Sequence, residues 1–305
     1  MKPAAEPVLD AAGVRLRGRV WPGPERGAPA VLLLHATSFC GAAWEPVWRA
    51  ACEAGAQAAG AVAPDARGHG ASDAPAAPEA YAWTRFAEDA VAWIDALAEI
   101  VPGAGADVVL AGHSSGATAA LAAAAARPEI VRGVLAVEPV LYDAPVPGVE
   151  VDSYPGSRFM AAQARRRRPR FESAAEARAR LGARAPYAGF APEALDAVLA
   201  GALAEEPSGE AALRCTPQVE ASCYDGAAAL DVWPAVSRIA CPVRLVAGER
   251  GFMPPPLVAR IREMLPRTRI ETLSGGTHFV ALEQPARVGE ALARFLRELT
   301  QDRVD

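Results

Sequence analysis

Ser114 lies at the centre of a pentapeptide framed by glycines, Gly112-His113-Ser114-Ser115-Gly116. This G-x-S-x-G pattern follows an apolar run and precedes an alanine-rich stretch, so it predicts a sharp turn from a strand into a helix. Such a turn presents the serine hydroxyl beside the free N–H groups of the helix's first turn, which stabilise developing negative charge. Nucleophilic attack by Ser114 is the chemistry indicated. Alone, the pattern also fits a glycine-rich turn with a serine helix cap.

A nucleophilic serine needs a general base, and the chain has only four histidines. His35 ends a predicted strand, His69 lies in a glycine-rich loop and His113 precedes the serine inside its turn, so we expect none of them to be the base. His278 follows Gly275-Gly276-Thr277, after the last predicted strand and before the last helix. A loop at that point reaches the nucleophile across the sheet, and His278 is therefore the predicted base.

The elements that position these residues alternate between two kinds. Short apolar runs predict strands at 30–36, 60–64, 107–112 and 131–137, and longer segments at 84–100 and 115–127 have helical spacing. Strands that are apolar on both faces and separated by helices predict a parallel sheet covered by helices.

The strand signal is lost from residue 140 to about 230, where proline, glycine and short helical patterns predict an inserted helical lid. Alternation then resumes with strands at 241–249 and 269–273 and helices at 256–265 and 285–299. We therefore predict one α/β core formed by residues 1–139 and 231–305, interrupted by a lid at 140–230.

Four motifs in this order resemble the α/β-hydrolase superfamily. They are HATSFCGAAW at 35–44, PDARGHGASD at 64–73, GHSSG at 112–116 and GTHFVALEQP at 276–285. The resemblance implies the α/β-hydrolase fold, with a mostly parallel sheet, helices on both faces and an inserted lid. It also implies an oxyanion hole formed by the backbone N–H groups of Thr37 and Ser115. In the first motif Ala36 replaces the usual glycine and Ser38 the usual proline.

The third member of the family's triad is absent from its usual place. A pattern like G-E-x-D is expected after the lid, but the chain has Gly248-Glu249-Arg250-Gly251. Two acids remain, Glu249 itself and Glu138 at the end of the strand before the lid. Certain haloalkane dehalogenases and the zearalenone-type lactonases resemble this chain in carrying the acid at the latter position. We predict Glu138, because a carboxylate at an apolar strand end needs a partner, although hydrogen bonds to local backbone would also satisfy it.

Together these residues predict hydrolysis of a carboxylic ester or lactone of a small to medium apolar substrate through an acyl-enzyme, without a metal or organic cofactor. Hydrolysis of a carbon–carbon bond in a diketone uses the same triad and stays open. So does a ligand-binding protein of this fold without turnover, which measured activity would distinguish.

Composition limits the partners. The formal net charge of −5 makes nucleic acid a poor partner. No run of 18 apolar residues indicates a membrane span, and the N-terminus lacks the apolar region of a secretory signal, so we expect a cytoplasmic protein. Five cysteines without C-x-x-C spacing favour neither disulfides nor a zinc cluster. The sequence does not distinguish a monomer from a homodimer.

The predicted lid contains nine arginines between Arg158 and Arg184. They fit recognition of an anion, but a solvated helix face is the favoured interpretation because acids lie nearby. Six apolar or aromatic lid residues are candidates to line a substrate pocket: Phe159, Met160, Phe171, Tyr187, Phe190 and Tyr224.

Overall fold

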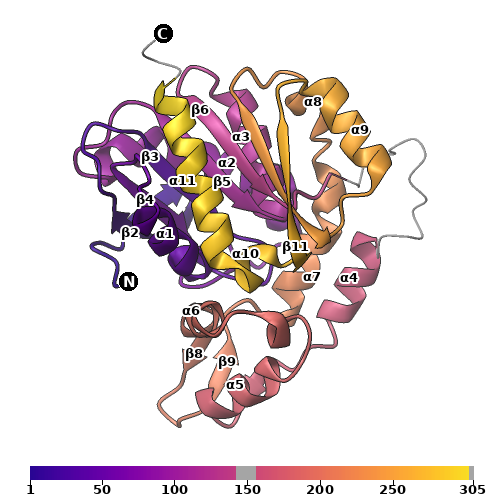
Figure 1. The fold of residues 1–305 in the computed structure, drawn as a ribbon. Coiled ribbons are helices and arrows are strands. Elements are labelled where there is room, and N and C mark those ends of the chain that lie inside the picture. Colours follow the sequence, from indigo (N-terminus) through magenta and orange to yellow (C-terminus); the bar gives the residue numbers. More distant parts are fainter. Residues whose placement is uncertain (142–155, 302–305) are drawn as a thin grey trace.

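An eight-stranded sheet forms the centre of the computed structural model, which describes residues 1–141 and 156–301 (Figure 1). Its strands are ordered β1-β2-β4-β3-β5-β6-β10-β11. The strands are β1 (Val8–Ala11), β2 (Val14–Pro22), β3 (Ala30–Leu34), β4 (Gly60–Pro64), β5 (Val108–His113), β6 (Val131–Val137), β10 (Val243–Arg250) and β11 (Arg269–Thr277). From β4 to β11 all neighbours are parallel, whereas β2 is antiparallel to β1 and β4. The predicted α/β-hydrolase fold is confirmed.

The predicted strands all form, with ends that differ by a few residues. β4 and β5 are buried along their whole length, as continuous apolar runs predict. The antiparallel pair β1 and β2 was not predicted. In β2 polar and apolar residues alternate, which is typical of a strand with one face in the core and one towards solvent.

Helices cover both faces of the sheet (Figure 1). On one face α1 (Glu45–Glu53) packs against α11 (Pro285–Gln301), and their apolar residues share a core cluster with β3 and β5. On the other face lie α2 (Trp83–Ile100), α3 (Ser115–Ala126), α8 (Trp233–Val236) and α9 (Pro255–Met264). Between β11 and α11 the chain forms a short helix, α10 (Val280–Glu283).

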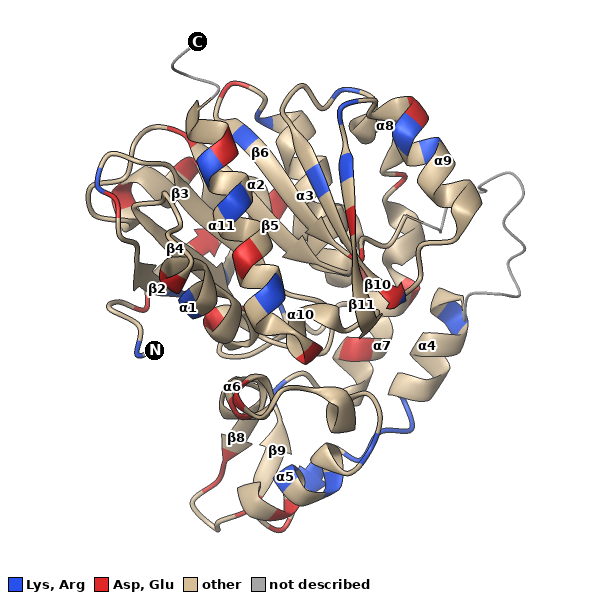
Figure 2. Cartoon of the chain, viewed as in Figure 1, with Lys and Arg blue, Asp and Glu red and all other residues tan. Residues whose placement is uncertain are grey.

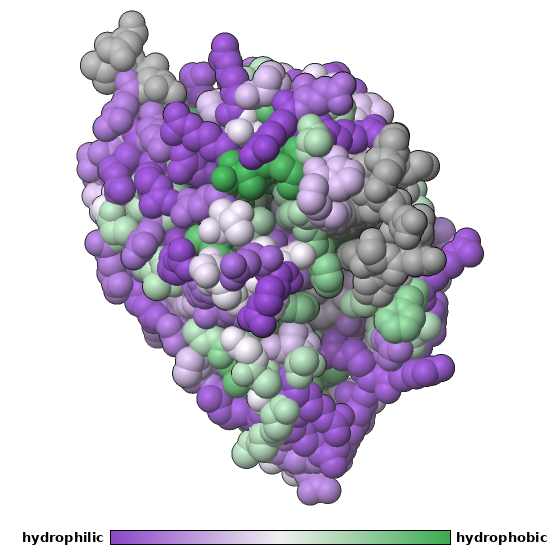
Figure 3. All heavy atoms as spheres, turned by 45° about the vertical axis from the view of Figure 1, so that its right-hand side comes forward, coloured by the Kyte–Doolittle hydropathy of each residue, from purple (hydrophilic) through white to green (hydrophobic). Residues whose placement is uncertain are grey.

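We use the name lid segment for residues 156–230, the described part of the predicted insertion. Its helices are α4 (Ser157–Ala164), α5 (Ala174–Gly182), α6 (Pro192–Ala202) and α7 (Pro217–Asp225). In Figure 1, α5 and α6 lie below the sheet, and in Figure 3 hydrophilic residues cover most of the lower end of the molecule. Residues 142–155, also assigned to the lid, lie outside the described residues, and the boundaries 140–230 stay a prediction.

The expectation that strands are absent from the lid was wrong. A second sheet, antiparallel and ordered β7-β9-β8, joins Arg170–Phe171, Ala211–Leu213 and Leu203–Glu205. Strands of two or three residues are too short for an alternating pattern to reveal, and these three are held by tertiary contacts.

Candidate active site

Ser114 lies at the turn between β5 and α3 with a backbone φ of +55°. A positive φ is strained for a serine, and such strain persists where the surroundings enforce it. Small neighbours make the turn possible, since a Cβ on Gly112 would lie 2.5 Å from the carbonyl oxygen of Gly116, and one on Gly116 would lie 2.5 Å from that of His35. The sequence-predicted turn therefore forms with the serine at its tip.

His278 approaches Ser114 from the loop between β11 and α10. Its Nε2 lies 2.9 Å from the Ser114 Oγ, within hydrogen-bonding distance. The loop is held because Glu283 accepts hydrogen bonds from the Thr277 N–H (2.7 Å) and hydroxyl (2.6 Å). The structure thus brings together the predicted nucleophile and the predicted base.

His113, which precedes the serine, also contacts this loop. Burial lowers the pKa of His113 to about 3, so its imidazole is neutral at ordinary pH. Its Nε2–H donates to the carbonyl oxygen of His278 over 2.8 Å. The sequence excluded His113 as the base, and the structure shows it holding the backbone of His278.

Glu138 completes the hydrogen-bonded chain. Its Oε2 lies 3.2 Å from Nδ1 of His278, and the carboxylate accepts the N–H groups of Gly248 and Phe252, each over 2.8 Å. The residue is 1% exposed and has a φ of +47°, a second strained residue at the carboxyl end of a strand.

The alternative acid lies elsewhere. Glu249 is exposed and accepts the N–H of Gly275 over 2.8 Å, which lowers the pKa of its carboxyl. It therefore contacts the backbone of β11 rather than His278. Of the two acids considered, only Glu138 contacts the histidine.

Thr37 and Ser115 meet beside the nucleophile. The Thr37 N–H donates to the Ser115 Oγ over 2.9 Å, and the two hydroxyl oxygens lie 3.0 Å apart. The Ser115 N–H belongs to the first turn of α3, whose N–H groups have no partner within the helix. Both predicted oxyanion donors are thus adjacent, although in this structure the Ser115 hydroxyl engages the Thr37 N–H.

Ser38 occupies the position where the family pattern has proline, and its φ is +78°. Both its backbone N–H and its hydroxyl form hydrogen bonds. Its N–H donates to Nε2 of His69 over 3.1 Å, and its hydroxyl donates to Oε1 of Glu220 over 2.6 Å. Glu220 belongs to α7 of the lid segment and is buried, and its other oxygen pairs with Arg167 at 2.5 Å. The sequence analysis missed Glu220, because no local pattern signals an acid that acts across a tertiary contact.

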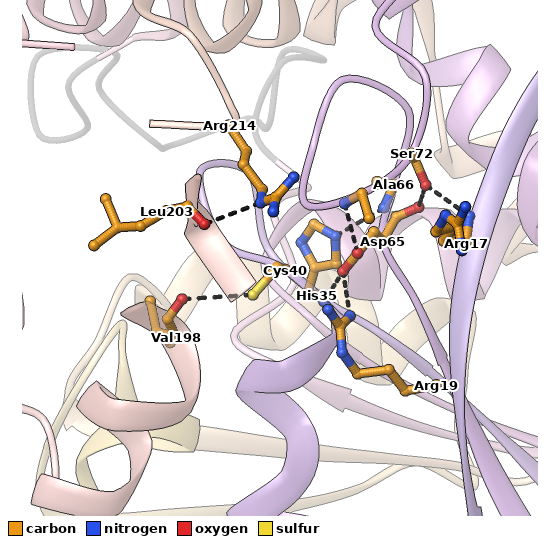
Figure 4. A network of polar contacts seen from close by, with 12 residues as sticks. Arg17, Arg19, His35, Cys40, Asp65, Ala66, Ser72, Val198, Leu203 and Arg214 are labelled. Atoms are coloured by element: carbon orange, nitrogen blue, oxygen red, sulfur yellow. Dashed lines mark hydrogen bonds and ion pairs between the residues drawn. The ribbon is translucent and has the colours of Figure 1, made fainter. Parts of the chain in front are cut away.

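Asp65 secures the loops behind the oxyanion donors (Figure 4). Its carboxylate accepts the N–H groups of Gly41 and Ala71, each over 2.8 Å, and pairs with Arg19 at 2.7 Å. Nearby, His35 accepts the Ala66 N–H over 2.9 Å through Nε2. These contacts stabilise the loop that contains the PDARGHGASD motif.

A cavity of about 180 Å³ contains Ser114 and His278. Two rings that the sequence analysis did not single out flank the histidine, with centroids 5.0 Å away for Phe252 and 5.3 Å away for Phe279. Among the candidate lid residues, Met160 and Tyr224 line this cavity. The cavity is therefore largely apolar around its hydroxyl and imidazole.

The other four lid candidates lie elsewhere. Phe171 and Tyr187 line a neighbouring cavity. Phe159 is 54% exposed, and Phe190 packs on Phe39 with ring centroids 5.8 Å apart. None of these four lines the cavity that contains Ser114.

Within residues 1–141 and 156–301, no three His, Cys, Asp or Glu side chains are grouped so as to hold a metal ion. No helix in the same ranges has the length and apolar character needed to cross a membrane.

The model of the alpha/beta hydrolase family matches residues 31–291. No curated protein matches the chain. Among solved structures, E-2-(acetamidomethylene)succinate hydrolase is similar with a TM-score of 0.78 and 23% identity, over 96% of this chain and 99% of that one. The peroxisomal alpha-beta-hydrolase Lpx1 of Saccharomyces cerevisiae gives 0.75 and 18%, over 98% and 85%. A malate-bound esterase of Thermogutta terrifontis gives 0.66 and 20%, over 97% and 99%. At these identities the structures show a shared fold.

Proposed function

The chain belongs to the alpha/beta hydrolase family, and on that premise we propose that it is a serine hydrolase with Ser114 as nucleophile, His278 as general base and Glu138 as the acid. One observation carries the proposal: the continuous contact from the Ser114 Oγ to Nε2 of His278 (2.9 Å) and from its Nδ1 to Glu138 (3.2 Å). Nucleophile, base and orienting carboxylate in this sequence of contacts are what acyl transfer requires.

The reaction begins when His278 takes the Ser114 proton as the serine oxygen attacks the substrate carbonyl. Negative charge on the carbonyl oxygen is stabilised by the N–H groups of Thr37 and Ser115, once the carbonyl oxygen has replaced the Ser115 hydroxyl as the acceptor of the Thr37 N–H. Losing one such donor costs about 2.7 to 4 kcal/mol of barrier. His278 then gives its proton to the leaving alcohol, which departs from the acyl-enzyme. Water, deprotonated by His278, attacks the acyl carbonyl and releases the acid with a free serine.

A carboxylic ester or a lactone is the proposed substrate. The apolar lining around Ser114 suits an acyl chain, and an esterase stands among the similar structures. Another of these is a hydrolase of a substituted succinate, so the fold accommodates more than one kind of substrate. Both that succinate and the malate bound to the esterase carry carboxylates.

The test uses 4-nitrophenyl acetate, butyrate and octanoate with the wild type, Ser114→Ala and a control, Ser208→Ala, which changes an exposed turn of the lid segment. We expect Ser114→Ala to lower kcat by at least about a thousandfold and the control to match the wild type. A fluorophosphonate probe adds a second readout, since its mass should appear on the peptide that contains Ser114. Equal turnover by Ser114→Ala, with folding checked by circular dichroism, would refute the assignment.

A further inference from the structure

A second cavity, of about 590 Å³, lies between the lid segment and the core. It adjoins the catalytic cavity, because both are lined by the same five residues: Thr37, Phe39, Met160, Tyr224 and Phe279. A substrate held at Ser114 can therefore extend into this second space. We call it the arginine cavity.

Five arginines line the arginine cavity: Arg166, Arg167, Arg168, Arg180 and Arg184. They come from two places in the chain, the segment between α4 and β7 and the segment at and after the end of α5. Figure 2 shows blue along both segments of the lid. Positive charge therefore reaches the cavity from two directions, unlike the charge on a single solvated helix face.

Two carboxylates pair with three of these five arginines, so part of the positive charge is not neutralised. Glu220 is the one carboxylate among the described lining residues, and it pairs with Arg167 and accepts the Ser38 hydroxyl. Arg168 and Arg180 share Glu176. Arg166 and Arg184 form no ion pair with any residue in the described ranges.

The neighbouring arginine on α5 behaves differently. Arg178 points out of the cavity, where it pairs with Asp196 on α6. The solvated-face interpretation fits Arg178. Four of the five arginines of the cavity are exposed as well, but unlike Arg178 they line one concave space. Concave surfaces of one charge raise the local concentration of the opposite charge.

Resting on the serine-hydrolase function above, we propose that the arginine cavity binds a carboxylate at the far end of the substrate, so that the enzyme prefers esters carrying a distal carboxylate over neutral ones. A guanidinium presents paired N–H donors that match a carboxylate geometrically. Apolar residues, including Phe171 and Leu181, line the same space and accommodate the methylene groups between the two ends.

The test compares mono(4-nitrophenyl) adipate with 4-nitrophenyl hexanoate, which share a leaving group and a six-carbon acyl chain and differ in the distal carboxylate. We expect the wild type to prefer the adipate ester. Arg184→Gln and Arg166→Gln should each lower kcat/KM for that ester by about tenfold, mainly through KM, with hexanoate unchanged. Arg178→Gln, which changes an arginine of α5 that does not line the cavity, should behave as the wild type. The preference should shrink as ionic strength rises.

Two results would overturn the inference. If hexanoate is hydrolysed as well as the adipate ester and the arginine variants do not change the ratio, the carboxylate is not recognised while the serine-hydrolase function stands. If the wild type hydrolyses neither ester, the assay contradicts the proposed serine-hydrolase function and leaves recognition of the carboxylate to be tested by binding. Calorimetric titration of the wild type with adipate then decides separately, because binding that is lost in Arg184→Gln supports the arginine cavity and no binding refutes it.

Discussion

The carboxylate of Glu138 fills the space that a side chain on Gly251 would need. A Cβ built on Gly251 would overlap Oε1 of Glu138 and lie 2.5 Å from its Cδ. Gly251 is the position at which the family pattern places its aspartate. The positions just after β6 and β10 thus approach one place beside His278, and in this structure the carboxylate of Glu138 occupies it.

We therefore expect Glu138→Gln to keep the fold and lower kcat by about a hundredfold or more, because the amide no longer stabilises the charged imidazolium. The change should appear in steady-state kinetics with 4-nitrophenyl butyrate. Glu249→Gln is the matched control, since Glu249 forms hydrogen bonds with Ser274 and Gly275 of β11 and not with His278. If the Glu249 change removed activity and the Glu138 change did not, the acid would be wrongly assigned.

The overlap also predicts how the acid can be moved. Gly251→Asp alone should be inactive or poorly folded, because the new side chain collides with Glu138. Glu138→Gly removes both the carboxylate and the strain at a φ of +47°. In the double variant Glu138→Gly/Gly251→Asp, we expect kcat to recover by about tenfold or more over Glu138→Gly. A double variant no more active than Glu138→Gly would contradict the inference that side chains at positions 138 and 251 reach the same place beside His278.

A hydrogen bond between Ser38 and Glu220 connects the loop that contains Thr37 to the lid segment. Ser38→Ala removes the 2.6 Å hydrogen bond without leaving Arg167 unpaired, so we expect a lower kcat with little change in stability. Glu220→Ala should lower kcat similarly, because it removes the acceptor of the Ser38 hydroxyl. It should also reduce the free energy of unfolding by about 2 to 4 kcal/mol, because it leaves a partly buried guanidinium without its charge partner.

Kinetics and urea unfolding of both single variants and the double variant test this coupling. The kinetic effects should be non-additive, since both changes break one hydrogen bond. Fully additive effects on kcat would show that Glu220 does not act through Ser38. Glu176→Gln, which affects a lid ion pair on Arg168 and Arg180, provides the control.

The sequence predicted what depends on local patterns. Continuous apolar runs located the parallel strands, and the glycines around Ser114 located a turn that only small neighbours permit. The absence of an aspartate at Gly251 also led to the prediction of Glu138, whose carboxylate contacts His278 in the structure. Local patterns do not reveal contacts between residues that are far apart in the sequence. Glu220 and Ser38, which form a hydrogen bond, are separated by 182 positions. Likewise, the arginines line a cavity that exists only when the lid segment is folded.

The cysteines provide a further prediction. Burial raises the pKa of the Cys40 thiol to about 12 and those of Cys52 and Cys241 to about 11, and it also raises those of Cys215 and Cys223. Thiolates react and thiols do not, so iodoacetamide at neutral pH should leave the native protein active and unmodified by mass. In urea all five should be alkylated. Rapid modification of the native protein would contradict this.

Buried neutral histidines predict how stability depends on pH. Burial lowers the pKa values of His35 and His113 to about 3, against 6.5 for an ordinary histidine, and lowers that of His69 as well. Between pH 6.5 and 3 the unfolded chain binds more protons at these sites than the folded chain does. Stability must therefore fall as the pH drops through this window, by up to about 1.4 kcal/mol per pH unit for each histidine.

Urea unfolding at several pH values between 7 and 5 measures this slope in the wild type and in His113→Gln. The glutamine can still donate to the carbonyl oxygen of His278 but takes up no proton, so the slope should be shallower by the share of one histidine. Carboxylates that titrate in this range contribute equally to both proteins and cancel in the comparison. Equal slopes would mean that His113 titrates alike in the folded and unfolded states, which would contradict the neutral donor that this structure places behind His278.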